Sequence, residues 1–580
     1  MAKTLLIGNA AVARGAYEAG VRVVSSYPGT PSTEITESIV KYPDVYVEWA
    51  PNEKVACEVA IGSSMAGGRA MTCCKHVGLN VMADPLFTAA YIGVNAGLVL
   101  CVADDPGMHS SQNEQDSRHY ARAAKVAMLE PSDSAECRDF TKMAFELSER
   151  FDTPVIVRLS TRVSHSQSLV EEHEPDTVAL KPYEKNVAKN VMMPANAIRR
   201  HVVVEERAKK LIEYAETTPL NRIEDNGAET GVICSGISYM YAHEALGDKV
   251  NYLKLGMAYP MPEQKIRAFA AKCRRLFVIE ELDPFIEEHC RALGVEVTGK
   301  SAFTMLGEYT PAMIAEAVLG KKPVWHPEIG EQIPVRPPVM CPGCPHRGTF
   351  YVLKKLGLTV SGDIGCYTLG AAAPLASVDS TICMGASVSA ALGMAKARGS
   401  EFNKKLVSVI GDSTFIHSGI TGLIDIVYNK GANTVIILDN SITGMTGHQD
   451  NPTTGKTIRG EKTKQVDLEA LCHAVGVEHV VVTDPFDVKT FEKVVKEEVE
   501  RDEPSVIIAQ RPCALLKTVK YSGRAAITEG CKNCHACMKL GCPAISLAEG
   551  AVQIDPNQCN GCGLCVNVCP FGAIEKEERA

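Results

Sequence analysis

The sequence has no basic block, no long apolar run and no leader-like start, and each absence narrows the possible classes of protein. Lysine and arginine number 60 against 69 acidic residues, so the formal net charge is −9. This charge argues against nucleic acid as the main partner. No apolar run reaches the ~18 residues that a spanning helix needs. The start, MAKTLLIGNA, lacks the apolar core and cleavage site of a signal peptide. We therefore expect a cytoplasmic protein without a membrane segment.

Cysteine, by contrast, is abundant, with 22 residues in the chain. Without an export signal, this number favours metal or redox chemistry in a reducing compartment over disulfide bonds. Hydrophobic residues make up 46% of the chain and charged residues 22%, which is the balance of a globular protein. At 580 residues the chain is long enough for three or four domains.

Changes in composition along the chain predict five segments, which are residues 1–180, 181–227, 228–325, 339–520 and 525–580. The first alternates apolar strands, beginning with Thr4–Leu6, with helical stretches, and this predicts a parallel α/β sheet. The second is polar and helical and is interpreted as a linker. The third is a smaller α/β unit and the fourth a second large α/β block. A proline-dense stretch at 322–338 predicts a stiff connection before that block.

Polar residues end two neighbouring strands of the second large block. One apolar strand, Leu406–Ile410, is followed by Gly411, Asp412 and Ser413, and the next, Thr434–Leu438, by Asp439 and Asn440. In open α/β sheets, ligands bind at such carboxyl ends. A carboxylate and an amide oxygen suit Mg²⁺. The pattern resembles the thiamine-diphosphate motif, in which Gly-Asp-Gly precedes an Asn, although Ser413 replaces the last Gly. An ordinary doubly wound βαβ unit is the alternative.

Three loops of the N-terminal segment follow predicted strands and offer polar groups. The turn Tyr27–Ser32 contains Thr30, and its amide and hydroxyl groups suit a carboxylate. Its alternative role is a plain strand-to-helix loop capped by Ser32. Glu53 opens a helix of small residues, where a carboxylate is also favoured by the helix dipole alone. His76 follows a third strand, and a structural role is equally consistent with its position.

The C-terminal segment carries the most specific pattern in the sequence. Two cysteine runs, each ending in Cys-Pro, match the bacterial two-cluster ferredoxin arrangement, in which the fourth cysteine of each run binds the other cluster. This arrangement predicts one [4Fe–4S] cluster on Cys531, Cys534, Cys537 and Cys569. It predicts a second on Cys559, Cys562, Cys565 and Cys542. Zinc can also bind such thiolates, but the doubled run favours iron–sulfur clusters.

Taken together, the motifs resemble the thiamine-diphosphate-dependent 2-oxoacid:ferredoxin oxidoreductases. Five further stretches narrow the resemblance to the α subunits of the indolepyruvate ferredoxin oxidoreductase group; they are Asn52–Ala56, Lys75–Val81, Cys341–Arg347, Asp363–Gly370 and Met445–Gln449. The resemblance spans essentially the whole chain. It implies two thiamine-diphosphate-binding doubly wound domains with a smaller transketolase-C-like α/β domain between them. A two-cluster ferredoxin-like α+β domain is expected at the C-terminus.

The resemblance also implies roles for single residues in the N-terminal domain. Glu53 is expected to hydrogen-bond the aminopyrimidine of the cofactor. Thr30 is expected to contact the substrate carboxylate, and His76 to donate or position a proton.

In the second block, the resemblance implies that Asp412, Asn440 and a backbone carbonyl near Ile442 hold Mg²⁺. The cofactor is expected to lie against Gly411, Ser413 and Gly447. A third, proximal cluster is expected on four cysteines outside the tail, Cys341, Cys344, Cys366 and Cys513. Buried structural thiols are the alternative for these four.

The implied reaction is oxidative decarboxylation of an aryl 2-oxoacid to an aryl-acetyl-CoA, with coenzyme A as co-substrate and ferredoxin as electron acceptor. A smaller β subunit is the expected partner. Three alternatives stay open: another oxoacid such as pyruvate or 2-oxoglutarate, a non-oxidative decarboxylase, and an electron-transfer subunit with an inactive cofactor site. The cysteine-rich tail argues against the second, and Glu53 together with Asp412 and Asn440 argues against the third.

Overall fold

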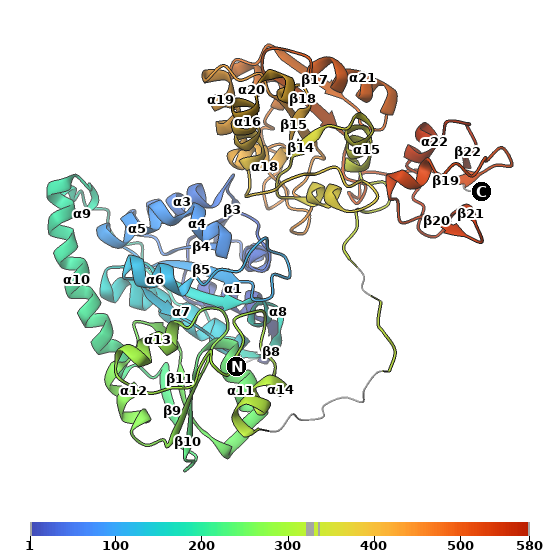
Figure 1. The fold of residues 1–580 in the computed structure, drawn as a ribbon. Coiled ribbons are helices and arrows are strands. Elements are labelled where there is room, and N and C mark those ends of the chain that lie inside the picture. The colour runs from blue at the N-terminus through green and yellow to red at the C-terminus, as the bar shows by residue number, and fades with distance from the viewer. Residues whose placement is uncertain (1–2, 321–329, 335–336, 578–580) are drawn as a thin grey trace. The chain divides into compact units, whose positions relative to one another are not determined.

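In the computed structural model, the chain forms two compact units, residues 1–330 and 331–580 (Figure 1). The structure describes residues 3–320, 330–334 and 337–577. The proline-dense stretch at 322–338 lies for the most part outside these residues, so the stiff connection stays a prediction. No helix among the described residues is both long and apolar enough to cross a membrane.

The first unit is built on a seven-stranded sheet with the order β12-β6-β7-β5-β4-β2-β3. All neighbours are parallel except β12, which runs antiparallel to β6. The strands are β2 (Val23–Ser26), β3 (Tyr46–Trp49), β4 (Ala70–Lys75), β5 (Leu98–Asp104), β6 (Ala127–Leu129), β7 (Val155–Ser160) and β12 (Met257–Tyr259). The central strands are continuous apolar runs because both faces of a parallel sheet are covered.

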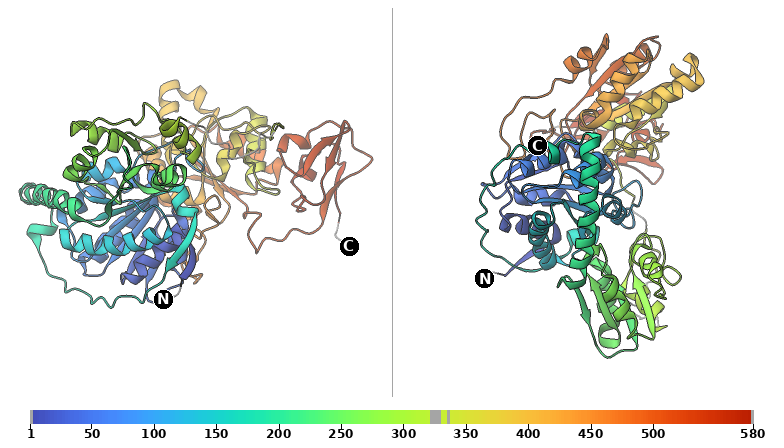
Figure 2. Two further views of the ribbon diagram at one scale, coloured as in Figure 1. Left: turned by 90° about the horizontal axis from the view of Figure 1, so that it is seen from below. Right: turned by 90° about the vertical axis from the view of Figure 1, so that its left-hand side faces the viewer.

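Helices cover both faces of this sheet (Figure 2). They are α1 (Gly8–Glu18), α2 (Thr33–Ile39), α3 (Glu53–Met65), α4 (His76–Val81), α5 (Ala83–Ile92), α6 (Arg118–Ala124), α7 (Ser134–Phe151) and α8 (Thr161–His165). Residues of α3, α5 and α6 share one apolar cluster with the strands. Many of these residues are alanine or cysteine, which lets the helices approach the sheet closely. The helix starts are thereby fixed at the carboxyl edge of the strands.

The first strand of the chain departs from the predicted parallel arrangement. β1 (Lys3–Ile7) pairs antiparallel with β8 (Gln167–Glu171) in a separate two-stranded ribbon. The prediction that Thr4–Leu6 belongs to the parallel sheet is wrong. Its residues are mostly half-buried or exposed, whereas a strand inside the parallel sheet is covered on both faces.

A four-stranded sheet completes the first unit, with the order β13-β10-β11-β9. Its strands are β9 (Asn221–Glu224), β10 (Thr230–Cys234), β11 (Asn251–Leu255) and β13 (Arg275–Ile279). Before them come α9 (Val187–Asn190) and the long α10 (Pro194–Thr217), and around them lie α11 (Gly236–Leu246), η1 (Gly247–Lys249), α12 (Glu263–Ala270), α13 (Phe285–Ala292) and α14 (Pro311–Leu319). The predicted linker is thus helical but ends in β9, which pairs antiparallel with β11.

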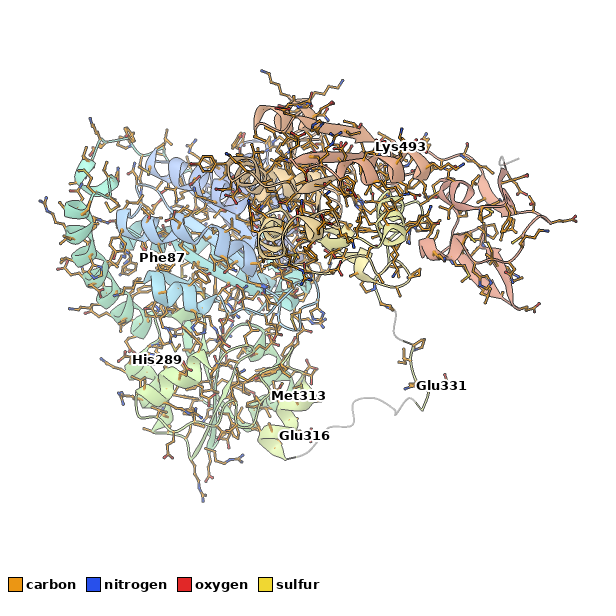
Figure 3. The ribbon with its side chains drawn as sticks, turned by 45° about the horizontal axis from the view of Figure 1, so that its top comes forward. Phe87, His289, Met313, Glu316, Glu331 and Lys493 are labelled. Atoms are coloured by element: carbon orange, nitrogen blue, oxygen red, sulfur yellow. The ribbon has the colours of Figure 1, made fainter. Side chains whose placement is uncertain are left out.

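The second unit contains a five-stranded parallel sheet with the order β14-β15-β16-β18-β17. Its strands are β14 (Thr359–Ser361), β15 (Leu406–Gly411), β16 (Thr434–Asp439), β17 (His479–Thr483) and β18 (Ser505–Gln510). The helices are α15 (His346–Leu356), η2 (Cys366–Ala371), α16 (Ala386–Arg398), α17 (Ser400–Asn403), α18 (Asp412–Thr414), the π-helical turn η3 (Phe415–Gly419), α19 (Ile420–Tyr428), α20 (Leu468–Ala474) and α21 (Val488–Glu498). The last buries Phe491 and leaves Lys493 exposed (Figure 3).

The cysteine-rich tail belongs to the second unit. It contains two antiparallel ribbons, β19 (Arg524–Ile527) with β22 (Ile574–Glu577) and β20 (Ile545–Ala548) with β21 (Ala551–Ile554), joined by η4 (Cys537–Leu540) and α22 (Leu564–Val568). Apolar residues of the tail share one core cluster with those around α15 and α21. Asn567 also donates to the carbonyl of Phe486, 2.9 Å away. The tail is therefore packed against the sheet domain.

Candidate cofactor and electron-transfer sites

The three candidate residues of the first unit follow neighbouring parallel strands. Thr30 lies in the loop after β2, Glu53 opens α3 after β3, and His76 opens α4 after β4. Since the carboxyl ends of parallel neighbours meet at one edge of a sheet, these residues come from one side of the domain. The structure therefore places all three at one sheet edge.

Glu53 is buried at the first position of α3. Asn52 caps this helix by accepting a hydrogen bond from the amide of Val55, at 2.9 Å. The carboxylate faces α4, where a Cβ built at Gly78 would lie 2.6 Å from Glu53 Oε1. Gly78 therefore leaves the space that the carboxylate occupies, and a larger residue there would displace it.

Lys75 links two loops at this sheet edge, although it is not among the site residues predicted from the sequence. The Lys75 side chain lies beside Gly29, and Nζ donates to the carbonyl of Ser110 at 2.8 Å. Burial lowers the pKa of Lys75 to about 8, while Asp105 and Glu53 oppose the shift. The sequence did contain a signal for this residue: a lysine directly after an apolar strand, since a lysine is rarely buried unless it has a structural or functional role.

His76 is also buried, and burial lowers the pKa of its imidazole, which favours the neutral ring. Nε2 lies 3.1 Å from the carbonyl of Asn113 and donates to it in that neutral form. Nδ1 has no hydrogen-bond partner among the described residues. The loop that supplies Asn113 also supplies Ser110, whose hydroxyl donates to the Thr30 carbonyl at 3.2 Å. This loop covers the predicted residues of the sheet edge.

The second unit brings the predicted metal ligands to the ends of adjacent strands, β15 and β16. Asp412 is only 2% exposed, and one carboxylate oxygen accepts from the Thr453 hydroxyl at 2.9 Å. Burial, together with the charge of Asp439, raises the pKa of Asp412 to about 7. No lysine, arginine or histidine pairs with it among the described residues. A buried carboxylate without a cation is a fitting ligand for a divalent ion, which would supply the missing charge.

Asn440, at the end of β16, is also buried, and its side-chain amide oxygen is a possible ligand of the same metal ion. Its side-chain oxygen accepts from the amide of Ile442 at 3.3 Å, which folds the chain into a tight turn. Its amide nitrogen lies 3.5 Å from His346 Nε2, and burial lowers the pKa of His346 to about 4. A neutral histidine beside Asn440 leaves the negative charge of Asp412 available to a metal ion.

The loop after Asn440 closes over the end of β15. Ser413 accepts a hydrogen bond from the Thr443 hydroxyl at 3.0 Å, and Asn451 donates to the same Thr443 hydroxyl at 3.2 Å. Gly447 has a φ of +122°, which favours glycine. Ser413, in the place of the motif's last glycine, is therefore part of the polar network of this loop.

Gly411 has a different local role from the expected close approach to a ligand. A Cβ built at Gly411 would lie 2.6 Å from the ring of Tyr367. The hydroxyl of Tyr367 donates to Thr414 Oγ1 at 3.0 Å. The space beside Gly411 is thus filled by Tyr367, which fixes η2 over the strand end.

The four cysteines predicted to hold the proximal cluster lie close to Asn440. Burial raises the pKa of the Cys366 thiol to about 11, with Cys513 and Cys341 adding to the shift. Burial likewise raises the pKa of Cys344 to about 12, and Cys366 and Cys341 contribute. The four thiols are therefore electrostatic neighbours, although they come from three distant parts of the chain. We refer to Cys341, Cys344, Cys366 and Cys513 as the proximal group.

One hydrogen bond and one shared neighbour, Gly444, link the proximal group to the predicted metal ligands. The amide of Cys513 donates to the main-chain carbonyl of Asn440 at 2.9 Å. A Cβ built at Gly444 would lie 3.5 Å from Cys366 Sγ and 3.9 Å from the Asn440 amide nitrogen. The proximal group and the predicted Mg²⁺ ligands are therefore neighbours within the second unit.

The tail cysteines have neighbours in keeping with the crossed membership that the spacing predicts, and the ligand assignment itself stays a prediction. Burial raises the pKa of Cys537, and its neighbours in this shift are Cys531, Cys534 and Cys569. Burial raises the pKa of Cys565 to about 12, and its neighbours are Cys562, Cys559, Cys542 and Cys537. We refer to Cys531, Cys534, Cys537 and Cys569 as the outer group, and to Cys542, Cys559, Cys562 and Cys565 as the inner group.

The surroundings of both tail groups fit iron–sulfur clusters. The four inner-group cysteines line one cavity. Main-chain amides point at sulfur atoms: Ala525 donates to Cys559 and Ala573 to Cys569, both at 3.3 Å. Such N–H···S bonds stabilise thiolates and tune cluster potentials.

Comparison with known proteins decides the family. A model of the pyruvate flavodoxin/ferredoxin oxidoreductase thiamine-diphosphate-binding domain matches residues 14–226. A model of the C-terminal thiamine pyrophosphate-binding domain matches residues 363–509, and a 4Fe–4S binding domain matches residues 552–575. The chain is 42% identical to the indolepyruvate oxidoreductase subunit IorA of Archaeoglobus fulgidus, over 99% of this chain and 97% of that protein. The chain belongs to the IorA family.

A second IorA relative, from Pyrococcus horikoshii, is 39% identical over 99% of this chain and 97% of its own length. A 2-oxoglutarate synthase subunit, KorA of Archaeoglobus fulgidus, is 28% identical over 55% of this chain. The family predicted from the motifs is therefore confirmed, as is the α/β fold with thiamine-binding domains and a ferredoxin-type tail. This IorA-family chain is an oxidoreductase whose domains are those that bind thiamine diphosphate and iron–sulfur clusters.

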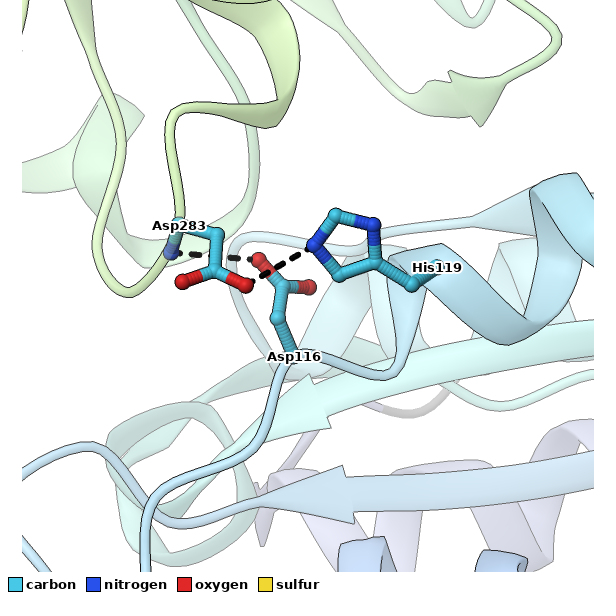
Figure 4. A group of neighbouring side chains, drawn as sticks. All are labelled: Asp116, His119 and Asp283. Carbon is cyan, nitrogen blue, oxygen red and sulfur yellow. Dashed lines mark hydrogen bonds and ion pairs between the residues drawn. The ribbon is translucent and has the colours of Figure 1, made fainter.

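One further group of potential metal ligands in this IorA-family chain has a structural explanation. Asp116, His119 and Asp283 converge in the first unit (Figure 4). Burial opposes ionisation of Asp116, but Arg118 and Arg158 hold its pKa below the usual range. Arg118 already supplies a cation here.

Arg118 also joins the two sheets of the first unit. Its Nη1 donates to Glu280 at 2.6 Å, after β13 of the four-stranded sheet. Glu280 is itself buried at this contact.

Proposed function

We propose that this chain is the larger subunit of an enzyme that oxidatively decarboxylates indolepyruvate and related aryl 2-oxoacids. The proposed products are an aryl-acetyl-CoA and reduced ferredoxin, with coenzyme A as co-substrate. The observation that carries the proposal is the contact between the proximal group and Asn440. A reaction that releases no electrons gains nothing from cysteine ligands beside its cofactor.

In the proposed site, Asp412, the side-chain oxygen of Asn440 and the carbonyl of Ile442 hold Mg²⁺. Their oxygen donors suit a hard cation that also binds phosphate oxygens. Ser413 and Gly447 are proposed to border the diphosphate, whereas Tyr367 fills the space beside Gly411. When bound, thiamine diphosphate supplies the carbanion-stabilising chemistry of decarboxylation.

In the first unit, Glu53 is proposed to hydrogen-bond the aminopyrimidine ring, which its burial beside Gly78 supports. Thr30 is proposed to orient the substrate carboxylate. His76 is proposed to position or relay a proton: burial keeps the ring neutral with its proton at Nε2, so Nδ1, which has no partner among the described residues, can accept a proton and pass it on.

Electrons are proposed to pass through three [4Fe–4S] clusters, held by the proximal, inner and outer groups. The chain is proposed to work with a smaller β subunit, in keeping with the word subunit in the names of its relatives. Cytoplasmic location and the absence of a membrane or nucleic-acid partner remain part of the proposal.

The test is anaerobic assay of the reconstituted complex with indolepyruvate, coenzyme A, Mg²⁺ and thiamine diphosphate. We expect stoichiometric ferredoxin reduction and acyl-CoA formation, faster with indolepyruvate than with pyruvate or 2-oxoglutarate. Release of an aldehyde without ferredoxin reduction would establish the non-oxidative alternative instead. Faster turnover of 2-oxoglutarate would assign the chain to the substrate class named by its KorA relative.

A further inference from the structure

Arg347 occupies a buried position between two cysteine-bearing loops of the second unit. It is the second residue of α15 and is 3% exposed. Its guanidinium donates to four main-chain carbonyls. Two come from the loop of the proximal group, Cys341 at 3.2 Å and Met340, and two from the tail before Cys542, Leu540 at 2.8 Å and Gly541 at 2.6 Å.

These hydrogen bonds use four of the five N–H donors of Arg347 but do not neutralise its charge. No carboxylate pairs with Arg347 among the described residues. Instead Arg347 lines one cavity with Cys542 and Cys562 of the inner group, and its Nε donates to the carbonyl of Cys341 of the proximal group. A buried charge without a counter-ion is unfavourable. The cysteines offer the only anionic chemistry facing it in the described part of the chain.

The same two loops also touch each other directly. Asn560, between two inner-group cysteines, donates to the carbonyl of Pro342 at 2.9 Å. A Cβ built at Gly343 would lie 2.3 Å from the side chain of Asn560. Arg347, Pro342 and Gly343 line the cavity of the inner group. The proximal and inner groups are thus separated by little more than this loop and the guanidinium.

We propose that Arg347 is a positioning residue for electron transfer: its permanent positive charge stabilises the reduced clusters of the proximal and inner groups and holds their loops in contact. This inference rests on the proposed function, since it requires clusters on both groups. A cluster held by four thiolates is anionic and becomes more so when it accepts an electron. A fixed cation beside it favours the reduced form and raises the reduction potential.

Transfer between the two groups then needs no accompanying proton. One cluster loses an electron and the other gains it, while arginine stays protonated throughout. Because the guanidinium faces both groups, it stabilises the electron on either side. None of the outer-group cysteines lines the cavity that Arg347 shares with the inner group, so the outer group is not expected to depend on Arg347.

The test uses the full chain, purified anaerobically and loaded with iron and sulfide, as the wild type and as Arg347→Gln and Arg347→Lys. Arg524→Gln is the matched control, because Arg524 is an exposed arginine of the same tail. Cluster potentials are measured by redox titration followed by EPR. This measurement needs no oxoacid, so it can succeed or fail independently of the proposed reaction.

We expect Arg347→Gln to shift two of three cluster potentials to more negative values, while Arg347→Lys retains them and Arg524→Gln changes none. Unchanged potentials in an iron-replete Arg347→Gln protein would overturn the inference. If that variant does not load iron, Arg347→Lys decides. Retained potentials with lysine support the role of charge, whereas potentials shifted despite the lysine charge, or failure to load iron, refute it.

Discussion

Replacing Asp412 by asparagine should stabilise the metal-free protein while removing its ability to bind Mg²⁺. The buried carboxyl of Asp412 has its pKa raised by burial and by Asp439 from 3.8 to about 7. A carboxyl shifted in this direction favours the native state below the unfolded pKa. That advantage is lost as pH rises from 3.8 to about 7. Asparagine keeps the shape of the side chain and carries no charge at any pH.

The size of the effect follows from the shift. Each pKa unit corresponds to about 1.4 kcal/mol, so ionised Asp412 costs about 4 kcal/mol at pH 8, where both states are ionised. At pH 5.5 the native carboxyl is protonated and the cost falls to about 2 kcal/mol. For a unit of this size, about 1 kcal/mol moves the melting temperature by roughly 2 to 4 °C. Asp412→Asn should therefore raise it by roughly 10 °C at pH 8 and by about half as much at pH 5.5.

The assay is calorimetric melting of the second unit's transition in chelator-treated protein at both pH values. Asp487→Asn is the control: Asp487 is an exposed helix cap in the same unit, and asparagine caps a helix as well. Adding Mg²⁺ and thiamine diphosphate should stabilise the wild type and leave Asp412→Asn unchanged. A variant that melts below the wild type at pH 8, or by the same difference at both pH values, would refute the reasoning.

Three further predictions concern the other site residues. Glu53→Gln should lower kcat by at least about 100-fold while the iron content stays that of the wild type; undiminished turnover in the anaerobic assay would contradict the role of Glu53. Lys75 loses its charge as pH rises through about 8, so kcat/KM should fall above that pH. The variant Lys75→Met should have a low kcat/KM that does not change with pH in this range. If kcat/KM of the variant still fell above about pH 8, Lys75 would not be the titrating group. Crossed ligation predicts that the double variant Cys531→Ser/Cys569→Ser loses the iron of one cluster. The double variant Cys559→Ser/Cys569→Ser should lose the iron of two clusters. The reverse pattern in iron analysis would show that each cysteine run holds its own cluster.

Much of the site could be predicted because its signals are local in sequence. The strands before Asp412 and Asn440 are apolar runs, and each is followed directly by polar residues. The tail cysteines lie within short stretches of sequence, so their spacing alone predicts which of them group together. The place of Glu53 followed from the small residues behind it.

The missed features depend on contacts between distant segments. Nothing near Gly411 in sequence indicates that Tyr367 fills the space beside it. Arg347 is only one residue of a conspicuous Cys-x2-Cys stretch until the tail folds back and provides Leu540 and Gly541 as acceptors. β1 is apolar enough for a parallel strand, and only its antiparallel partner β8, about 160 residues away, shows where it pairs.

Asn440 has a consequence for the order in which the protein matures. Its side chain belongs to the predicted metal site, and its main-chain carbonyl accepts from Cys513 of the proximal group. Whatever inserting iron does to the affinity for thiamine diphosphate, the vitamin must do equally to the affinity for iron, because such linkage is reciprocal. Positive coupling would make a cell short of one nutrient retain the other less well in this protein, and negative coupling would do the opposite.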